Sequence, residues 1–267
     1  MYDPCNLQHQ TLDYMLKSLL RPLRQKLFPK PVVAGTTVQL SPADEAIAAR
    51  CRPYTMTSPE RMASLLDSVE YIVKRDLPGA FAECGVWRGG SVLAMALKLM
   101  DLGVRDRDIY LYDTFEGMTA PTDHDTSPFH APASVDWEAA QKAGGKIYDG
   151  LFNAEIFNES LVRDVLLQSG YPAERFHFVR GPVEQTIPGT MPSELALLRL
   201  DTDWYESTRH ELVHLYPLLT RNGVLIIDDY GHWEGARRAT DEYFADGSAT
   251  PVFLHRVDYT ARLAIKP

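Results

Sequence analysis

The stretch Leu200-Asp201-Thr202-Asp203-Trp204-Tyr205 and the stretch VLIIDDY at 224–230 each join an apolar run to two acidic residues. This pattern is typical of buried parallel strands that end at the carboxyl edge of a sheet and release polar side chains into a crevice. The side chains of Asp201, Asp203, Asp228 and Asp229 are therefore expected to lie together. Four carboxylates without a cation would raise each other's pKa, so the cluster indicates a bound metal ion or a shared proton, and we favour the metal.

Short apolar runs alternate with helical segments after Pro78-Gly79. Strands and helices that alternate in this way form a parallel sheet with right-handed crossovers. The last two runs are separated only by Asp258-Tyr259 and a few neighbours, which favours an antiparallel hairpin. We therefore expect an α/β fold with a seven-stranded, mostly parallel sheet. The expected strands are 80–84, 109–112, 176–179, 195–200, 224–227, 252–256 and 261–265.

Residues 1–78 precede the sheet and are expected to form a helical N-terminal extension, with residues 79–267 as the main domain. An amphipathic pattern at 11–27 favours a helix that packs on the domain or on a second subunit rather than on a membrane. Ser41-Pro42 and Ser58-Pro59 each place an N-cap residue before a proline, which predicts two more helix starts. We expect a homodimer or a higher homo-oligomer.

Residues 114–150 interrupt the alternation, since they carry little periodicity and are too long for an ordinary strand-to-helix connection. They are expected to form a lid over the crevice. Asp123, His124, Asp125 and His130 in this segment could be read as metal ligands, but polar residues in such a loop more often face water.

The composition excludes several classes of protein. Of the 267 residues, 45% are hydrophobic and 24% charged, as in ordinary soluble domains, and the net charge of −9 argues against nucleic-acid binding. The three cysteines, Cys5, Cys51 and Cys84, have neither disulfide-framework nor zinc spacing, so a reducing cytoplasm is expected. No apolar run approaches the roughly 20 residues that span a bilayer, and the start is unlike a signal peptide, so we expect no membrane partner.

The first expected strand runs into Glu83-Cys84-Gly85-Val86-Trp87-Arg88-Gly89-Gly90-Ser91, and a helix is expected to begin near Ser91. Glycines there let the backbone approach a ligand, and the helix N-terminus offers unpaired N–H groups. Asp113, at the end of the second strand, is placed to hold the hydroxyls of a ribose. Glu83 would repel a pyrophosphate but suits the ammonium and sulfonium groups of S-adenosylmethionine. The pattern therefore favours S-adenosylmethionine over a dinucleotide.

Several blocks of the chain resemble the macrocin O-methyltransferase family, whose members are metal-dependent class I methyltransferases that modify sugar hydroxyls on macrolide and aminocoumarin antibiotics. The resemblance covers roughly residues 54–245. The blocks that carry it are 83–91, 110–118, 198–208, 214–217, 226–230 and 235–243.

The resemblance implies a Rossmann-like sheet with helices on both faces, S-adenosylmethionine as the cofactor, and Mg²⁺ held by three carboxylates. On the matching positions it makes Asp201, Asp228 and Asp229 the metal ligands and Asp203 the general base. It also assigns a set of residues to cofactor binding. These are Thr55, Met56, Glu83, Gly85, Val86, Gly89, Ser91, Asp113 and Phe115.

The implied reaction is methyl transfer to a sugar hydroxyl of a small-molecule glycoside acceptor. In it, Mg²⁺ would hold two adjacent hydroxyls and Asp203 would remove a proton, although Asp203 could instead cap the helix that follows. Catechol-type phenols would satisfy the same chelation. A less favoured alternative is a glycosyltransferase, because Asp201-Thr202-Asp203 is also a DxD sequence.

Aromatic residues flank these motifs, and we expect two of them to contact the substrate and the others to lie in the core. They are Trp87, Phe115, Trp204, Tyr205 and Trp233. His232, next to the metal motif, is expected to lie on a surface loop.

Overall fold

The computed structural model of the protein describes residues 38–247 and 249–267. Residues 40–267 form one compact unit. The expected helix at 11–27 lies outside the described residues, so that helix and its packing stay predictions.

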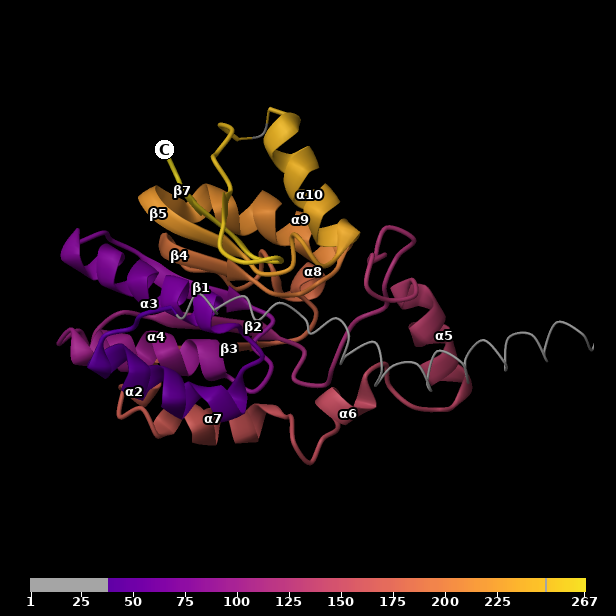
Figure 1. The fold of residues 1–267 in the computed structure, drawn as a ribbon, viewed down its shortest axis with the longest axis horizontal. Helices are drawn as coiled ribbons and strands as arrows, with labels where there is room; N and C mark the ends of the chain where they lie inside the picture. Colours follow the sequence, from indigo (N-terminus) through magenta and orange to yellow (C-terminus); the bar gives the residue numbers. More distant parts are fainter. Residues whose placement is uncertain (1–37, 248) are drawn as a thin grey trace, which may run out of the picture. The chain divides into compact units, whose positions relative to one another are not determined.

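A seven-stranded sheet in the order β3-β2-β1-β4-β5-β7-β6 forms the centre of this unit (Figure 1). Neighbouring strands among the first five are parallel, whereas β7 is antiparallel to both β5 and β6. The predicted mixed sheet with an antiparallel final pair is therefore confirmed. The strands are β1 Ala80–Cys84, β2 Ile109–Asp113, β3 Phe176–Arg180, β4 Leu195–Leu200, β5 Leu219–Ile227, β6 His255–Arg256 and β7 Arg262–Ile265.

Two strand boundaries differ from the prediction by more than one residue. β5 begins five residues earlier than expected, at Leu219, because Asn222-Gly223 resembles a turn in the sequence but lies within the strand. Asn222 has a φ of 66°, and its N–H still donates to the Lys266 carbonyl at 2.8 Å. β6 is limited to His255–Arg256, where it pairs with β7.

Helices cover both faces of the sheet in three layers (Figure 1). One face packs against α2 (Pro42–Cys51), α3 (Pro59–Lys74), α4 (Gly90–Asp101) and α7 (Glu159–Leu167). The other face packs against α8 (Val183–Thr186), α9 (Tyr205–Leu215) and α10 (Glu234–Ala245). The remaining short elements are η1 Arg52–Tyr54, α5 Ala133–Lys142, α6 Asp149–Phe152, η2 Ala173–Arg175 and η3 Tyr216–Leu218.

The two predicted serine N-caps are confirmed. Ser41 Oγ accepts from the Asp44 N–H and Ser58 Oγ accepts from the Arg61 N–H, each at 3.1 Å, which satisfies one orphan donor per helix. The buried face of α3 has helical spacing and belongs to the same core as α4. Its main residues are Met62, Leu65, Leu66, Val69 and Ile72. The described helices of the N-terminal extension therefore share the core of the domain.

The segment between β2 and α7, residues 114–158, is called the insertion below. It contains α5 and α6, which the sequence did not reveal because only one residue of α5, Ala133, is buried. Its first half is attached to the domain by hydrogen bonds. Trp204 Nε1 donates to the Thr119 carbonyl at 3.0 Å, and the Glu234 N–H donates to the Thr126 carbonyl at 2.8 Å.

Asp125 in the insertion does not face water, contrary to the prediction for the polar residues of this segment. It is fully buried, and its Oδ1 accepts from the Tyr205 N–H at 2.7 Å while its Oδ2 accepts from the Thr122 N–H at 2.6 Å. A short carboxylate fits there because it satisfies an orphan donor at the N-terminus of α9.

Cys51 and Cys84 are free and buried, and burial raises the pKa of the Cys51 thiol to about 12. Both therefore stay protonated at neutral pH. Within residues 38–247 and 249–267, no helix has the length and apolarity that crossing a membrane requires.

Candidate active site

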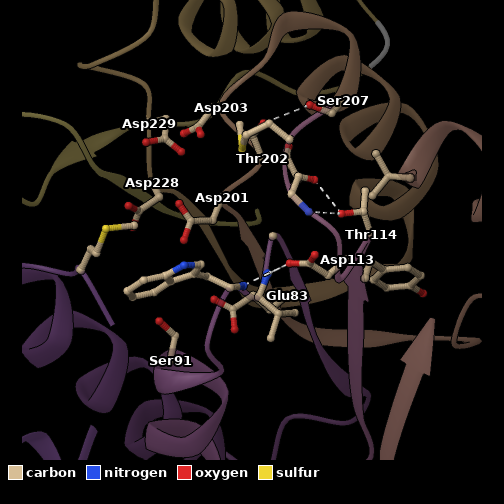
Figure 2. Close-up of a pocket in the computed structure, with 18 of the residues that line it drawn as sticks. Glu83, Ser91, Asp113, Thr114, Asp201, Thr202, Asp203, Ser207, Asp228 and Asp229 are labelled. Carbon is tan, nitrogen blue, oxygen red and sulfur yellow. Dashed lines mark hydrogen bonds between the residues drawn. The ribbon is translucent and has the colours of Figure 1, made fainter. Parts of the chain in front are cut away.

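A pocket of about 360 Å³ lies at the carboxyl ends of β1, β2, β4 and β5, where the order of the strands changes direction (Figure 2). Ligands of open α/β sheets bind at this kind of position. All four predicted aspartates, Asp201, Asp203, Asp228 and Asp229, line it. Seven of the nine residues predicted to bind the cofactor also line it, namely Thr55, Met56, Glu83, Gly85, Val86, Ser91 and Asp113.

The turn after β1 needs glycine for a reason internal to the protein. Gly85 has a φ of 82°, and a Cβ there would lie 2.0 Å from the backbone oxygen of Asp201. A Cβ on Gly90 would lie 2.5 Å from the Tyr54 carbonyl oxygen. The sequence suggested that these glycines let a ligand approach the backbone. In the structure they are required within the protein, because Gly85 lets β1 approach β4 and Gly90 lets η1 approach the start of α4.

Asp113 holds the same turn in place. Its Oδ2 accepts from the N–H groups of Val86 at 2.7 Å and Trp87 at 3.1 Å, and its Oδ1 accepts from the Phe115 N–H at 2.7 Å. Burial raises the pKa of Asp113, while the backbone hydrogen bonds lower it. Asp113 also lines the pocket, so a ligand hydroxyl can approach its carboxylate.

Gly89 and Phe115 do not line the pocket. Gly89 is the N-cap of α4, with a φ of 83°. Phe115 was predicted to contact the cofactor, but its ring lies in the core between Phe157 and Phe178, with centroids 6.5 and 5.8 Å away. An aromatic ring gains more from burial in that apolar site than from the polar edge of the sheet.

Arg199 on β4 organises the floor of the pocket, and the sequence analysis missed it. Its guanidinium donates to Glu83 and to Asp201 through Nη1, the latter at 2.6 Å, and to Asp228 through Nη2 at 2.6 Å. Burial alone would lower the pKa of Arg199, but the three carboxylates raise it well above its ordinary value. A charged residue inside the otherwise apolar run 195–200 was the signal, because a buried charge requires partners.

Glu83 keeps one oxygen free for a ligand. Its Oε1 accepts from Arg199, whereas its buried Oε2 has no hydrogen-bond partner in the described structure. Burial raises the pKa of Glu83 to about 7, even though Arg199 lowers it. A cationic group next to Oε2 would stabilise the charged form of this carboxylate.

Asp201, Asp203 and Asp229 form the tightest carboxylate cluster. One oxygen from each lies within 4.8 Å of the others. Burial raises the pKa of Asp203 to about 7, and the charge of Asp201 adds to the rise. Burial also raises the pKa values of Asp201 and Asp229 well above the ordinary range. Asp229 Oδ2 is buried without a hydrogen-bond partner.

The turn that carries Asp203 is held by its neighbours. Asp203 has a φ of 66°, a conformation that is costly for a residue other than glycine and that recurs at functional sites. Thr202 Oγ1 donates to Glu211 Oε1 at 2.9 Å. Asp203 does not cap α9, since Asp125 accepts from the Tyr205 N–H instead.

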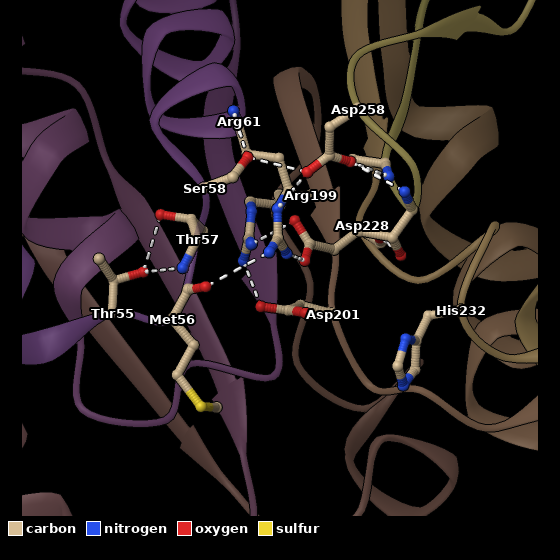
Figure 3. A network of polar contacts seen from close by, with 12 residues as sticks. Thr55, Met56, Thr57, Ser58, Arg61, Arg199, Asp201, Asp228, His232 and Asp258 are labelled. Atoms are coloured by element: carbon tan, nitrogen blue, oxygen red, sulfur yellow. Dashed lines mark hydrogen bonds and ion pairs between the residues drawn. The ribbon is translucent and has the colours of Figure 1, made fainter. Parts of the chain in front are cut away.

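Asp228 is bound by two guanidinium groups. Its Oδ1 accepts from Arg199, and its Oδ2 accepts from Arg61 of α3 (Figure 3). Arg61 was also missed, because a single arginine near the start of an amphipathic helix is normally exposed. The three predicted metal ligands therefore do not share one environment. Asp201 and Asp229 lie in the tight cluster, whereas Asp228 lies next to it on the two arginines.

The charges of the site fit a divalent cation. The described residues that line the pocket carry seven carboxyl groups, and the guanidinium groups of Arg61 and Arg199 pair with only some of them, which leaves an excess of acidic groups. Five of the seven belong to Glu83, Asp201, Asp203, Asp228 and Asp229, and the other two to Asp113 and Glu184. Hard oxygen donors with one unpartnered oxygen, on Asp229, are the ligands that Mg²⁺ prefers.

The outer rim of the pocket is aromatic. Of the five aromatic residues named from the sequence, Trp87 and Trp233 line the pocket and the other three do not. His232 and Tyr259 also line it, and His232 Nδ1 lies 3.1 Å from Tyr259 Oη. His232, expected on a surface loop, is therefore part of the pocket wall. Burial lowers its pKa, and His130 of the insertion, 3.1 Å away between Nε2 atoms, lowers it further.

Comparisons with known proteins relate the whole domain to O-methyltransferases. A family model described as Macrocin-O-methyltransferase (TylF) matches residues 43–263. The chain is 33% identical over 190 residues to the 8-demethyl-8-(2,3-dimethoxy-alpha-L-rhamnosyl)-tetracenomycin-C 4'-O-methyltransferase of Streptomyces olivaceus, covering 71% of this chain and 67% of that protein. It is 31% identical over 193 residues to the demethyldecarbamoylnovobiocin O-methyltransferase of Streptomyces niveus, covering 72% and 68%. The solved structure of the O-methyltransferase NovP superposes with a TM-score of 0.67 at 28% identity, covering 80% of this chain and 82% of that one.

The sheet order, the glycine turn after β1 and the carboxylate pocket, together with these relatives, define a class I S-adenosylmethionine-dependent O-methyltransferase. Within this class, the chain belongs to the macrocin O-methyltransferase family, because the family model covers most of its length. The resemblance inferred from the sequence motifs is confirmed, and membership of this family excludes the glycosyltransferase alternative.

Proposed function

We propose that the protein transfers a methyl group from S-adenosylmethionine to a sugar hydroxyl of a glycosylated natural product, with Mg²⁺ bound at the pocket carboxylates. The observation that carries this proposal is the pocket itself, which places a cluster of carboxylates beside the predicted cofactor residues. The names of two relatives describe O-methyltransferases that act on tetracenomycin and novobiocin precursors, which supports a glycoside acceptor.

The methionine end of the cofactor is proposed to lie against Glu83 and the start of α4. Glu83 Oε2 is free to accept from an ammonium group, and α4 begins at a glycine N-cap with no side-chain hydrogen bond. Its first N–H groups are therefore available to an anionic group such as the carboxylate of the cofactor. Asp113 is proposed to hold the ribose, with Thr55 and Met56 covering the cofactor from the opposite side.

Asp201, Asp228 and Asp229 are the proposed metal ligands, and Asp203 is the proposed general base. Asp228 can serve although both of its oxygens accept from arginines, because each carboxylate oxygen has a second lone pair. Bound at these residues, Mg²⁺ would lower the pKa of an alcohol that it holds. Burial and the charge of Asp201 raise the pKa of Asp203, whereas a cation bound at Asp201 and Asp229 would lower it again, so that Asp203 would be charged and able to accept a proton at neutral pH.

The reaction is a substitution at the methyl carbon of the sulfonium. A new bond forms between the acceptor oxygen and the methyl carbon, and the bond between that carbon and sulfur breaks, which leaves neutral S-adenosylhomocysteine. The acceptor proton goes to Asp203. The pocket would hold the acceptor oxygen in line with the methyl group, and such alignment supplies a large part of the rate enhancement in two-substrate reactions.

The aromatic rim is proposed to contact the acceptor outside its sugar. Phe129 of the insertion stacks on His232 with centroids 5.2 Å apart and meets Tyr259 edge-on at 5.6 Å. Phe129 is 56% exposed and Tyr259 is 55% exposed, and exposed apolar side chains that gather beside a pocket often mark a ligand-binding surface. A carboxylate floor with an apolar rim suits a ligand that has a polyol end and an apolar end.

An assay of S-adenosylhomocysteine formation tests the acceptor class. The purified protein with S-adenosylmethionine and Mg²⁺ is offered demethyldecarbamoylnovobiocin, simple rhamnosides and the catechol 3,4-dihydroxybenzoate. We expect methyl transfer to at least one glycoside and none to the catechol. Turnover of the catechol alone would contradict the sugar assignment and support the catechol-type alternative.

Asp113→Ala is expected to weaken S-adenosylhomocysteine binding about 10- to 100-fold, the usual effect of losing hydrogen bonds to a charged group. Calorimetric titration of the ligand measures the change. Asp106→Ala removes the same charge from an exposed position and serves as the control. Because Asp113 also holds the glycine turn, Asp113→Asn is included to keep an acceptor oxygen in place. Unchanged affinity in both Asp113 variants would show that the ribose lies elsewhere.

A further inference from the structure

Arg61 joins three segments of the chain that are far apart in the sequence (Figure 3). Its Nη1 donates to Asp228 at the end of β5, and its Nε lies 3.2 Å from Asp258 Oδ2 in an ion pair that lacks the geometry of a hydrogen bond. Its Nη2 donates to the Met56 carbonyl at 3.3 Å. The side chain of Arg61 is only 16% exposed, so these contacts are made largely out of water.

The first of these segments, residues 55–58, covers the cofactor half of the pocket. Thr55, Met56 and Thr57 line the pocket, and the Oγ1 atoms of Thr55 and Thr57 lie 3.0 Å apart. The segment follows Tyr54, whose carbonyl oxygen contacts Gly90 at the start of α4. The position of this segment therefore decides how the cofactor half is closed.

The third segment, residues 258–261, links segment 55–58 to the backbone of Asp228. Asp258 accepts from Ser58 Oγ at 2.8 Å and, through Oδ1, from the N–H groups of Thr260 and Ala261. Thr260 Oγ1 in turn donates to the Asp228 carbonyl at 2.7 Å. Arg61 thus closes a ring of contacts that runs from segment 55–58 through Asp258 and Thr260 to Asp228.

The chemistry of the guanidinium group suits this ring. Burial lowers the pKa of Arg61, but Asp228, Asp201 and Asp258 raise it above its ordinary value, so the group stays charged. A planar guanidinium presents several donors in fixed directions, whereas a lysine ammonium on a flexible stem does not reproduce three separated contacts. The role of Arg61 is therefore geometric as well as electrostatic.

We propose that Arg61 is a positioning residue that couples the two halves of the pocket, because it holds segment 55–58 over the cofactor only while it is paired with Asp228. This inference rests on the proposed placement of the cofactor in the pocket. It depends neither on the identity of the acceptor nor on the assignment of the metal ligands. A change at Asp228 should consequently alter cofactor affinity through Arg61, although Asp228 lies at the carboxylate end.

A double-mutant cycle on S-adenosylhomocysteine binding tests the coupling. Calorimetric titrations in EDTA compare the parent with Arg61→Ala, Asp228→Asn and the double variant. We expect Arg61→Ala to weaken binding about tenfold or more, as for lost hydrogen bonds to a charged group. Asp228→Asn should weaken binding in the parent but cause no further loss in the Arg61→Ala background.

The control is Arg75→Ala, which removes the same charge from the exposed far end of α3 and should leave affinity unchanged. Arg61→Lys separates charge from geometry and should resemble Arg61→Ala. If Arg61→Ala does not fold, the cycle is run with Arg61→Lys and Asp258→Asn. An Arg61 variant that binds within twofold of the parent would overturn the proposal. An Asp228→Asn effect of equal size in both backgrounds would also overturn it.

Discussion

Replacing Asp203 by asparagine is expected to lower kcat by about 10²- to 10⁴-fold, the usual contribution of general-base catalysis. The amide keeps the size of the side chain and its place in the pocket but cannot accept the acceptor proton. Affinities for S-adenosylhomocysteine and for the divalent cation should stay within a few-fold of the parent, because Asp203 is proposed to contact neither. Steady-state kinetics give the first quantity, and calorimetric titration gives the other two.

The matched control for this variant is Glu206→Gln. Glu206 lies in the first turn of α9, close to Asp203 in the chain, but it is exposed and does not line the pocket. It should retain parental kcat. Strongly reduced cation binding in Asp203→Asn would reassign Asp203 as a ligand, as its place in the cluster with Asp201 and Asp229 permits.

Removal of divalent cations with excess EDTA is expected to lower methyl transfer by about 100-fold or more, and added Mg²⁺ should restore it. A bound metal ion typically contributes several kcal/mol to such a reaction, and each 1.4 kcal/mol corresponds to a factor of ten. Asp229→Asn should weaken cation binding in particular, because it removes a buried carboxylate oxygen that has no other partner. S-adenosylhomocysteine affinity in this variant should stay near the parental value.

Asp164→Asn, on the exposed side of α7, controls for the loss of one negative charge. Asp228→Asn distinguishes the proposed ligand set, which contains Asp228, from the tight cluster, which contains Asp203 in its place. If Asp201, Asp228 and Asp229 are the ligands, this variant binds the cation more weakly than Asp203→Asn does. Full activity in EDTA would show that the carboxylates work without a metal ion.

The fold could be predicted from the sequence because its signals are local. The strands β1 and β4 coincide with the runs 80–84 and 195–200, since strands that are buried on both faces are mostly apolar, and only Glu83 and Arg199 interrupt the two runs with a charge. Ser41 and Ser58 mark helix starts through hydrogen bonds that span only three residues. The start of β5 was missed because a polar Asn222-Gly223 pair carries the same local signal within a strand as in a turn.

The site was predicted to the level of strand ends. Acidic residues that follow buried strands must emerge at one edge, so Asp201, Asp203, Asp228 and Asp229 were correctly expected in one pocket. The direction in which a side chain points was harder to predict from the sequence. Phe115 follows Asp113 by two residues, yet its ring points into the core because Phe157 and Phe178 provide an apolar site there.

The sequence by itself determined the seven strands, the edge of the sheet at which the carboxylates gather, and the family. Only the tertiary structure decided which of those carboxylates form ion pairs with arginine side chains. Arg199 reaches Glu83 across 116 positions of the chain, and Arg61 reaches Asp228 across 167. A buried guanidinium requires partners, but no local pattern says which carboxylate will supply them, because ion pairs depend on the register of strands and the packing of helices.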